Sequence, residues 1–539
     1  MQTYDAVIVG AGHNGLVSAC ILARRGLNTL VLERREVVGG MCATEEIFEN
    51  FKYDTGAVFP YWIKEQVIEE FQLAKHGLEF IDTGGITYTA IFPDGAYLTF
   101  YEDLRKTAEE IKKFSQKDAE AYVDFVTFWK KFKPIVDTLL VSLPPLDLIK
   151  EFTKPLPVKL ALLKMFGKLP TSLNKLLELL KEPANLEAMA EFLFKSTGTK
   201  LDELFESEYV KAALAPESLE VSLSGPSSAP MSALVWRIMM KERTGRVKGG
   251  MGNFTIALKR AAEEAGAHIR TGAEVEKIMV REGTARGVRL KNGEEIEAKI
   301  VASNADPRRT FLSLVGEEHL DPATLKRVKK FKLVASGLRL NYALSQKPDF
   351  RIPEERQVGA VMYCPSLEYS ERAFAEAILG DPPSRPILLL DVPTVTDHTL
   401  APPGAHILQS WVNPTVYAPK HGSWDAIKER YNDNLTDLIS EFTPGFRSSI
   451  LHSFIQTPVD FERRFYATGG DVEHGDFSWY QQLWFRPMLG CHEGRTPIRN
   501  LYIVGGGIHP GGGVRALPGM ISGRTILDDL RTGKAGKSI

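Results

Sequence analysis

The feature that most constrains the fold of this chain is the pattern at its amino-terminal end. An apolar run at 4–9 is followed by Gly10, Gly12 and Gly15 in the spacing Gly-x-Gly-x-x-Gly. The run is typical of a strand buried on both faces of a parallel sheet. The three glycines allow a tight turn, a close approach of the backbone to a diphosphate, and close packing of a helix on the strand. The pattern predicts a dinucleotide-binding β-α-β unit.

The residues that follow complete this unit. We expect a helix over about 14–25, which begins at Asn14 and directs its free N–H groups at the phosphates. Gly26 is suited to end this helix. A second strand is expected at 29–32, and Glu33 follows directly after it. A carboxylate in this position accepts hydrogen bonds from the ribose hydroxyls of a bound adenine dinucleotide.

A second glycine-rich segment lies near the other end of the chain. An apolar run at 501–504 leads into a glycine cluster that contains Gly505, Gly506 and Gly513. Glycines let the backbone press against a flat ring where any Cβ would collide. A nicotinamide dehydrogenase needs only the amino-terminal fingerprint, whereas a flavoprotein that encloses FAD needs both ends. The pairing of the two ends predicts an FAD-dependent oxidoreductase.

Longer motifs carry a resemblance to a known family. The chain resembles the phytoene desaturase-type FAD-dependent oxidoreductases, and within them the branch of pyridine nucleotide-disulfide oxidoreductase domain-containing protein 2. Three segments carry the likeness to that branch: Gly-Ala-Gly-His-Asn-Gly-Leu-Val at 10–17, Gly-Gly-Asp-Val-Glu-His-Gly at 469–475, and His-Pro-Gly-Gly-Gly at 509–513. Carotenoid desaturases usually lack the second segment, which weakens a carotenoid-specific assignment.

The resemblance implies a set of FAD contacts. In the family, the strand that holds Val275 passes the adenine, and the helix that starts near Pro518 lies beneath the isoalloxazine with its dipole toward the N1–C2 edge. Many members carry Arg after the second glycine pair, where this chain has Met41, so Arg34 or Arg35 is expected to assist the diphosphate. The expected FAD-contacting residues are Gly10, Gly12, Asn14, Gly15, Glu33, Arg34, Gly39, Gly40, Gly56, Val275, Gly505, Gly506, Gly513, Pro518, Gly519 and Met520.

The resemblance also implies an α/β fold class. We expect a discontinuous, glutathione-reductase-type Rossmann FAD-binding domain with an inserted α+β substrate-binding sheet and a helical cap. The expected FAD-binding domain takes residues 1–85, 236–310 and 491–539, the cap takes 86–235, and the substrate-binding domain takes 311–490. Within the second FAD-binding part, Asn292-Gly293 separates two expected strands and predicts a type I′ hairpin turn.

For the chemistry, the resemblance implies transfer of hydride from a substrate C–H bond to flavin N5, with loss of a proton from the adjacent carbon. His509 and His474 are the candidate bases, with Glu473 and Asp476 as further candidates. Arg515 is expected to oppose charge on the reduced ring or to bind a phosphate. A histidine in a glycine-rich turn also serves as a hydrogen-bonding scaffold, and this alternative stays open for both histidines.

Composition excludes several classes of protein. With 539 residues the chain predicts two or three domains, and its net charge of −2 gives no nucleic-acid footprint. Its four cysteines stand far apart, which argues against a disulfide framework and for a reducing compartment. No apolar run reaches the roughly 20 residues of a spanning helix, and the early fingerprint leaves no room for a signal peptide. We expect a cytoplasmic protein with no metal site.

One segment departs from this neutrality. Residues 130–181 contain ten lysines and four acidic residues, a net charge of +6, so the rest of the chain carries −2 − 6 = −8. Two stretches, at 160–169 and 173–181, are basic and amphipathic. Such helices can lie in an anionic membrane interface. The alternative is a cap whose apolar faces pack on the protein. The sequence favours peripheral membrane contact, which suits the entry of a water-insoluble substrate.

We therefore expect desaturation of a hydrophobic, isoprenoid or lipid-like substrate, with a quinone or oxygen as electron acceptor because no separate nicotinamide site is visible. One alternative is a flavin amine oxidase, in which Trp479, Tyr480 and Trp484 would supply aromatic rings beside the flavin. Covalent flavin attachment through Cys491 is a less favoured variant. A second alternative is a non-catalytic flavin-bearing protein that binds membranes or partners. Reduction of an isoprenoid double bond is the reverse reaction and stays open.

Overall fold

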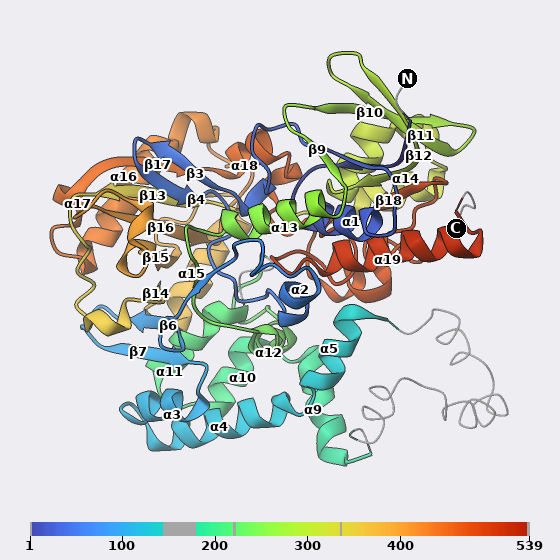
Figure 1. The fold of residues 1–539 in the computed structure, drawn as a ribbon. Helices are drawn as coiled ribbons and strands as arrows, with labels where there is room; N and C mark the ends of the chain where they lie inside the picture. The colour runs from blue at the N-terminus through green and yellow to red at the C-terminus, as the bar shows by residue number, and fades with distance from the viewer. Residues whose placement is uncertain (1–2, 144–178, 180, 219–222, 335–336, 536–539) are drawn as a thin grey trace.

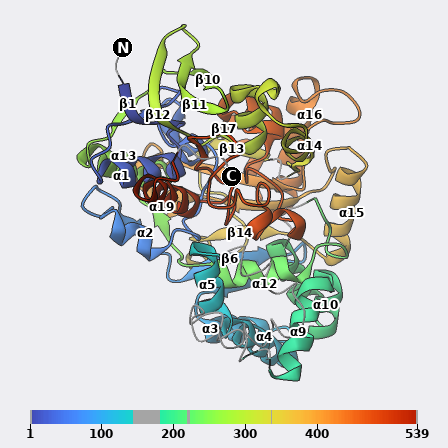
Figure 2. The same ribbon diagram turned by 90° about the vertical axis from the view of Figure 1, so that its right-hand side faces the viewer.

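A computed structural model describes residues 3–143, 179, 181–218, 223–334 and 337–535 of the chain. Two large sheets lie side by side, and a group of helices lies at the lower end of the molecule in the views of Figures 1 and 2. The expected α/β fold class is confirmed. Residues 144–178 and 180 lie outside the described residues, and with them lies nearly all of the two basic amphipathic stretches.

The first sheet joins the two ends of the chain. β1 (Thr3–Val9) lies parallel to β2 (Thr29–Leu32) on one side and to β12 (Glu295–Ser303) on the other, and β12 lies parallel to β18 (Leu501–Ile503). Their last residues are in register, so the loops after all four strands meet at one edge of the sheet. The remaining strands of this sheet are β9 (His268–Arg270), β10 (Val275–Arg281) and β11 (Thr284–Leu290).

Three helices cover this sheet at the fingerprint. α1 (His13–Ala23) packs against α13 (Gly252–Glu264) and α19 (Leu517–Thr532), and Figure 1 shows α1 beside both. A Cβ on Gly519 would overlap the backbone oxygen of Asn14, so glycine allows α19 to approach α1 this closely. The Ser18 hydroxyl donates to the Gly519 carbonyl at 2.8 Å across the same contact.

The second sheet has the strand order β17-β13-β16-β15-β14-β6-β7. β7 (Tyr97–Tyr101) forms one edge, and β6 (Ile86–Ile91) lies between it and β14 (Ala360–Tyr363), with which β6 pairs in parallel. The expectation that residues 86–101 belong to the helical cap is therefore wrong, because β6 is buried along its whole length against a partner far along the chain. The other strands are β13 (Arg339–Leu344), β15 (Ile387–Asp391), β16 (His406–Asn413) and β17 (Ile450–Gln456).

The helical group begins after β7. Figures 1 and 2 show α3, α4, α9 and α10 together at the end of the molecule away from β10–β12. The helices of this group are α3 (Leu104–Lys112), α4 (Gln116–Lys130), α5 (Lys133–Val141), α9 (Pro183–Phe194), α10 (Thr197–Leu204), α11 (Glu208–Leu214) and α12 (Met231–Met240). Elsewhere lie α2 (Glu65–Glu70), α14 (Pro322–Lys330), α15 (Leu367–Ile378), α16 (Trp424–Phe442), α17 (Phe446–Ser449) and α18 (Pro458–Phe465). Two short antiparallel pairs complete the fold: β3 (Thr44–Phe48) with β4 (Phe51–Asp54), and β5 (Phe80–Ile81) with β8 (Arg246–Val247).

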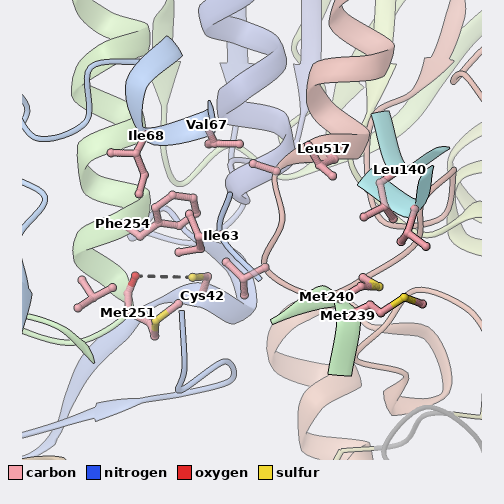
Figure 3. Close-up of a cluster of buried hydrophobic side chains, with 14 of the residues drawn as sticks. Cys42, Ile63, Val67, Ile68, Leu140, Met239, Met240, Met251, Phe254 and Leu517 are labelled. Atoms are coloured by element: carbon pink, nitrogen blue, oxygen red, sulfur yellow. Dashed lines mark hydrogen bonds between the residues drawn. The ribbon is translucent and has the colours of Figure 1, made fainter. Parts of the chain in front are cut away.

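One hydrophobic core connects the helical group with the first sheet's helices. Figure 3 shows Leu140 of α5 and Met240 of α12 on the side where Leu517 begins α19. On the other side of the view, Cys42 donates from Sγ to the Met251 carbonyl at 3.6 Å. All four cysteines are buried and unpaired with one another. The helical group is thus anchored by shared apolar packing to the helices that cover the first sheet.

The turn at Asn292-Gly293 differs from the type I′ turn expected from the sequence. Of the Asn292-Gly293 pair, only Gly293 has a positive φ (+89°), so the turn is not type I′, which needs positive φ at both central residues. The Asn292 side chain instead accepts from the Glu294 N–H at 3.0 Å and stabilises a different turn.

Among the described residues, no helix is long and apolar enough to span a membrane.

Candidate active site

A cavity of about 310 Å³ lies at the edge where the loops after β1, β2 and β12 meet. Val9, Leu32 and Asn304 line it from the first sheet, and Leu389 and Trp411 line it from the second. The two sheets therefore share one cavity. Most of the residues expected to contact FAD line it: Gly10, Gly12, Asn14, Glu33, Arg34, Gly39, Gly40, Gly56, Val275, Gly506 and Gly513.

The remaining expected residues lie outside the cavity lining: Gly15, Gly505, Pro518, Gly519 and Met520. A Cβ on Gly15 would overlap the Gly10 carbonyl oxygen, which is the close helix-to-strand packing that the fingerprint predicts. Gly505 packs against Asn304 in the same way. Pro518, Gly519 and Met520 form the first turn of α19 and do not line the cavity, because this turn is buried against α1. The flavin contact expected of these three stays a prediction.

The amino-terminal glycines form a cradle. Gly39 has a φ of +111°, and a Cβ on Gly40 would lie 3.7 Å from the Gly12 Cα, so the two glycine segments face each other. α1 begins after Gly12 without a side-chain cap, which leaves its first N–H groups for another acceptor. A diphosphate is suited to this cradle because the helix terminus attracts negative charge.

Glu33 has a second role besides the expected contact with the ribose. Its carboxylate accepts from the Ala11 N–H at 2.8 Å and from the Arg35 N–H at 3.0 Å. It therefore stabilises the turn between Gly10 and Gly12 while it lines the cavity. A contact with the ribose would come in addition to these two hydrogen bonds.

We expect Glu33→Ala to weaken FAD binding by about 1–3 kcal/mol, since it removes a charge-assisted acceptor from two backbone donors. Equilibrium titration of the apoprotein with FAD measures this change. Glu36→Ala is the matched control, because Glu36 is exposed and does not line the cavity. Equal affinities of the Glu33→Ala variant and the wild type would contradict the prediction.

The two arginines considered for the diphosphate differ in position. Arg35 forms an ion pair with Glu45. Arg34 lines the cavity, donates from Nη2 to the Arg463 carbonyl at 3.0 Å, and lies with its guanidinium 3.9 Å from the centre of the Tyr466 ring. Arg309, which belongs to none of the motifs, also lines the cavity and lies 3.4 Å from the same ring centre. The phosphate contact of Arg34 stays a prediction.

The indole ring of Trp62 lies against the carboxyl-terminal glycine loop and leaves no space for a side chain at Gly513. A Cβ on Gly513 (φ +80°) would overlap the Trp62 ring. The guanidinium of Arg515 lies 4.6 Å from the centre of this ring, and that of Arg237 lies 5.1 Å from it. Burial lowers the pKa of the Arg515 guanidinium to about 9. Arg515 does not line the cavity itself, and the role expected of it stays a prediction.

The structure does not support His509 as a base. Its Nε2 donates to the Leu139 carbonyl of α5 at 2.7 Å, and the side chain is 3% exposed and does not line the cavity. Burial lowers the pKa of this imidazole to about 3, so it is neutral and a weak proton acceptor. His509 connects the glycine loop to the helical group, which is the scaffold alternative.

We expect this buried histidine to make the protein less stable in mild acid. The pKa is about 6.5 in the unfolded chain and about 3 in the folded protein, so the stabilisation is complete above pH 6.5 and is lost as the pH falls toward 3. Between pH 7 and pH 5 this loss amounts to about 2 kcal/mol. Urea unfolding of the FAD-loaded wild type and of His509→Gln at both pH values measures it. The wild type should lose more stability than the variant by this amount, and equal losses would refute the prediction.

Two other histidines do face the cavity. His474 lines it with Nδ1 unpaired among the described residues, and burial lowers its pKa against the opposing effect of Asp306 and Asp471. His13, inside the fingerprint, lines it with Nε2 likewise unpaired in the described part of the chain. Its pKa is lowered to about 4 by burial and by the nearby His474. The catalytic role expected of His474 stays a prediction, and its lowered pKa makes it a weaker base than a free imidazole.

The residues present fit FAD. The glycine cradle and the uncapped start of α1 suit the diphosphate, and the cavity continues from Glu33 to Gly513. Unpaired polar atoms within the described residues remain along this path, as they would where a polar ligand supplies the partners. These atoms are His13 Nε2, Trp62 Nε1, Glu473 Oε2 and His474 Nδ1.

Comparisons with known proteins agree with this site. The family model described as flavin containing amine oxidoreductase matches residues 15–359. This chain belongs to that family. It is 33% identical to pyridine nucleotide-disulfide oxidoreductase domain-containing protein 2 of Mus musculus, over 98% of this chain and 94% of the relative. It is 25% identical to a lycopene-forming phytoene desaturase of Pseudescherichia vulneris, over 96% of each chain.

Family membership confirms the resemblance inferred from the motifs and identifies the protein as an FAD-dependent oxidoreductase. The fold is shared with a solved oxidoreductase from Methanosarcina mazei, with a TM-score of 0.60 at 16% identity over 98% of this chain and all of that one.

Two expectations attached to the amine oxidase alternative are corrected. Trp479 and Tyr480 are exposed, and neither they nor Trp484 line the cavity. Cys491 is buried outside the lining, which argues against covalent flavin attachment there.

Proposed function

We propose that this FAD-dependent oxidoreductase dehydrogenates an uncharged, hydrophobic substrate of isoprenoid or lipid-like character. Bound FAD supplies the hydride acceptor. The observation that carries the proposal is the apolar lining of the cavity near the second sheet, formed by Val58, Phe59, Leu389, Trp411 and Val472. Apolar surface buried there contributes roughly 25 cal/mol per Å². The similarity to a phytoene desaturase over nearly the whole chain supports the same class of substrate.

The charges at this wall also favour an uncharged substrate. Trp62, the ring nearest the glycine loop, already has the guanidiniums of Arg237 and Arg515 over it. The Arg515 guanidinium would repel a cationic amine beside this ring, and the repulsion is strong where water is excluded. Arg237 adds less because it is paired with Glu217, and Glu473 at the same wall offsets the repulsion only in its ionised form.

A flavin amine oxidase is the second candidate, since the family includes amine oxidoreductases. The aromatic rings Phe59, Tyr61, Trp62 and Trp411 line the cavity and favour it. Against it, none of the described cavity-lining residues is a lysine that would hold a water beside the flavin. We rank this candidate below the dehydrogenase.

Anaerobic bleaching of the flavin distinguishes the two candidates. The FAD-loaded protein is mixed with phytoene in detergent micelles and, separately, with benzylamine, and the loss of yellow absorbance is followed. Bleaching by phytoene alone supports the proposal, and bleaching by benzylamine alone contradicts it. Leu389→Asn should slow the productive reaction because it puts a polar group into the lining, whereas Leu379→Asn, at an exposed position, should not.

We propose that the electron acceptor is a quinone or oxygen. The support is that the fingerprint of β1 and α1 belongs to the cavity that suits FAD, so it does not serve a separate nicotinamide nucleotide. Reoxidation of the chemically reduced protein by air, by a water-soluble quinone and by NAD⁺ should be compared. Fast reoxidation by NAD⁺ alone would contradict this proposal.

We also propose peripheral contact with an anionic membrane through the segment 130–181 and the surface beside it. Its net charge of +6 supports this. Close to this segment in sequence, α9 carries Phe194, which is 85% exposed, and the ring of Phe192 in the same helix lies 5.7 Å from that of Trp479. Both segments carry exposed apolar side chains: Leu186, Leu193 and Phe194 in α9, and Trp479, Tyr480, Phe485 and Leu489 in the region around Trp479.

Sedimentation with vesicles tests this contact. Binding to anionic vesicles should be strong at low salt and fall steeply with added salt, because each lysine near the surface contributes roughly 1 kcal/mol. Phe194→Glu should weaken it, while Ile378→Glu on α15, which is also exposed, should not. Recovery of the intact protein in the supernatant at low salt would leave 130–181 as a cap only.

A further inference from the structure

Glu473 is the carboxyl group at the wall of the cavity beside the carboxyl-terminal glycine loop. It lines the cavity, and its Oε2 has no hydrogen-bond partner among the described residues. A Cβ on Gly512 would overlap this oxygen, so the carboxyl group stands directly against the loop between Gly506 and Gly513. Glu473 is therefore a polar group that faces the cavity with an acceptor atom still available.

The loop that carries Glu473 is held in one geometry by buried polar contacts. Asp471 accepts from the Glu473 N–H at 2.9 Å and from the Gly475 N–H at 3.2 Å. Arg486 donates from Nη2 to the Glu473 carbonyl at 3.0 Å and from Nε to the Gly506 carbonyl at 3.0 Å. The same guanidinium thus fixes Glu473 relative to the glycine loop. Such positioning is what a group that accepts a proton requires.

Burial and the charges around Glu473 allow its carboxyl group to gain and lose a proton near neutral pH. Burial raises the pKa of this carboxyl, and the negative charge of Asp471 adds to the rise. Arg515, Arg486 and Arg237 oppose both effects, and the balance puts the pKa at about 7. A base with a pKa near the working pH combines a useful ionised fraction with a useful affinity for the proton. His474, the neighbouring residue, is a weaker base because burial lowers its pKa.

We propose that Glu473 is the catalytic residue that accepts the proton in the dehydrogenation, a role that rests on the proposed function. One substrate carbon loses its hydrogen as a hydride to the bound cofactor. The neighbouring carbon loses its hydrogen as a proton to the Glu473 carboxylate, and the electron pair of that C–H bond becomes the second bond of the new C=C. The substrate loses two electrons, the cofactor gains them, and Glu473 becomes a neutral acid. The proton later leaves when the cofactor is reoxidised.

The proposal predicts that reduction of the cofactor is coupled to protonation of Glu473, which can be measured without any substrate. A carboxyl close enough to take the proton must sense the negative charge that reduction adds, so its affinity for a proton rises on reduction. One additional linked proton changes the reduction equilibrium tenfold per pH unit, which is about 30 mV for a two-electron couple. We expect the midpoint potential of the FAD-loaded wild type to fall by this additional amount per pH unit just above pH 7.

The experiment equilibrates FAD-loaded proteins with reference dyes between pH 6 and pH 9. Glu473→Gln should lose the additional slope, and Asp476→Asn should keep it, because Asp476 is a buried carboxyl of the same loop outside the cavity lining. Equal slopes for the wild type and Glu473→Gln overturn the proposal. If Glu473→Gln fails to bind FAD, Glu473→Asp decides, because it keeps a carboxyl and should keep an additional slope in a shifted pH range. Failure of phytoene to bleach the flavin would overturn the proposed substrate class and leave the slopes unchanged.

Discussion

Gly15→Ala should abolish stable FAD binding. A Cβ at this position would overlap the carbonyl oxygen of Gly10 and come within 3.2 Å of the Asn304 amide nitrogen. Since both contacts belong to the edge where β1 and β12 end, α1 would have to move away from the sheet. Overpacking of this kind costs about 1–3 kcal/mol of stability, and we expect FAD affinity to fall by at least about 100-fold because the diphosphate cradle moves with α1.

Titration of the apoprotein with FAD and urea unfolding measure the two effects. Gly26→Asn is the control within the same β-α-β unit: it has a φ of +81°, which Asn tolerates, and no atom lies within 4 Å of its Cβ position. Gly12→Ala should disturb folding less than Gly15→Ala, since its Cβ meets the flexible end of the Asn304 side chain at 2.8 Å. FAD binding by Gly15→Ala with wild-type affinity would be incompatible with this account of the fingerprint.

Arg486→Met should be among the most destabilising substitutions outside the fingerprint. Arg486 is 0% exposed and donates to the carbonyls of Glu473, Gly475, Asp476 and Gly506. Methionine leaves all four carbonyls without this donor in a buried region. Removal of one partner from such a buried charged network costs about 3–5 kcal/mol.

The same substitution should reduce FAD retention, because Gly506 and the loop of Glu473 that Arg486 holds against it both line the cavity. Arg486→Lys should recover little, since a lysine ammonium cannot reach four carbonyls from one planar group. Arg463→Met is the control: its ion pair with Asp425 is exposed, and its loss should cost no more than about 1 kcal/mol. Thermal and urea unfolding that rank Arg463→Met as equal to Arg486→Met would contradict the role assigned to Arg486.

The sequence by itself determined the elements whose cause is local. The apolar run and the glycine spacing predicted the β-α-β unit, and the strand expected at 29–32 is β2 (Thr29–Leu32). The helix expected over about 14–25 corresponds to α1 (His13–Ala23). Gly10, Gly12 and Glu33 line the cavity as expected, since a short loop after a buried strand has little choice of direction.

Only the tertiary structure decided which side chains from distant segments meet. His509 and His474 looked alike in sequence, yet His509 is bound to α5 and His474 faces the cavity. The strands at 86–101 joined the second sheet because β6 pairs with β14, a strand far along the chain. Trp62 and Arg486 gave no local signal at all, since their roles depend on the glycine loop that packs against them. Periodicity and turn chemistry act over a few residues, whereas these contacts depend on how whole elements pack, and that is set by burial summed over the molecule.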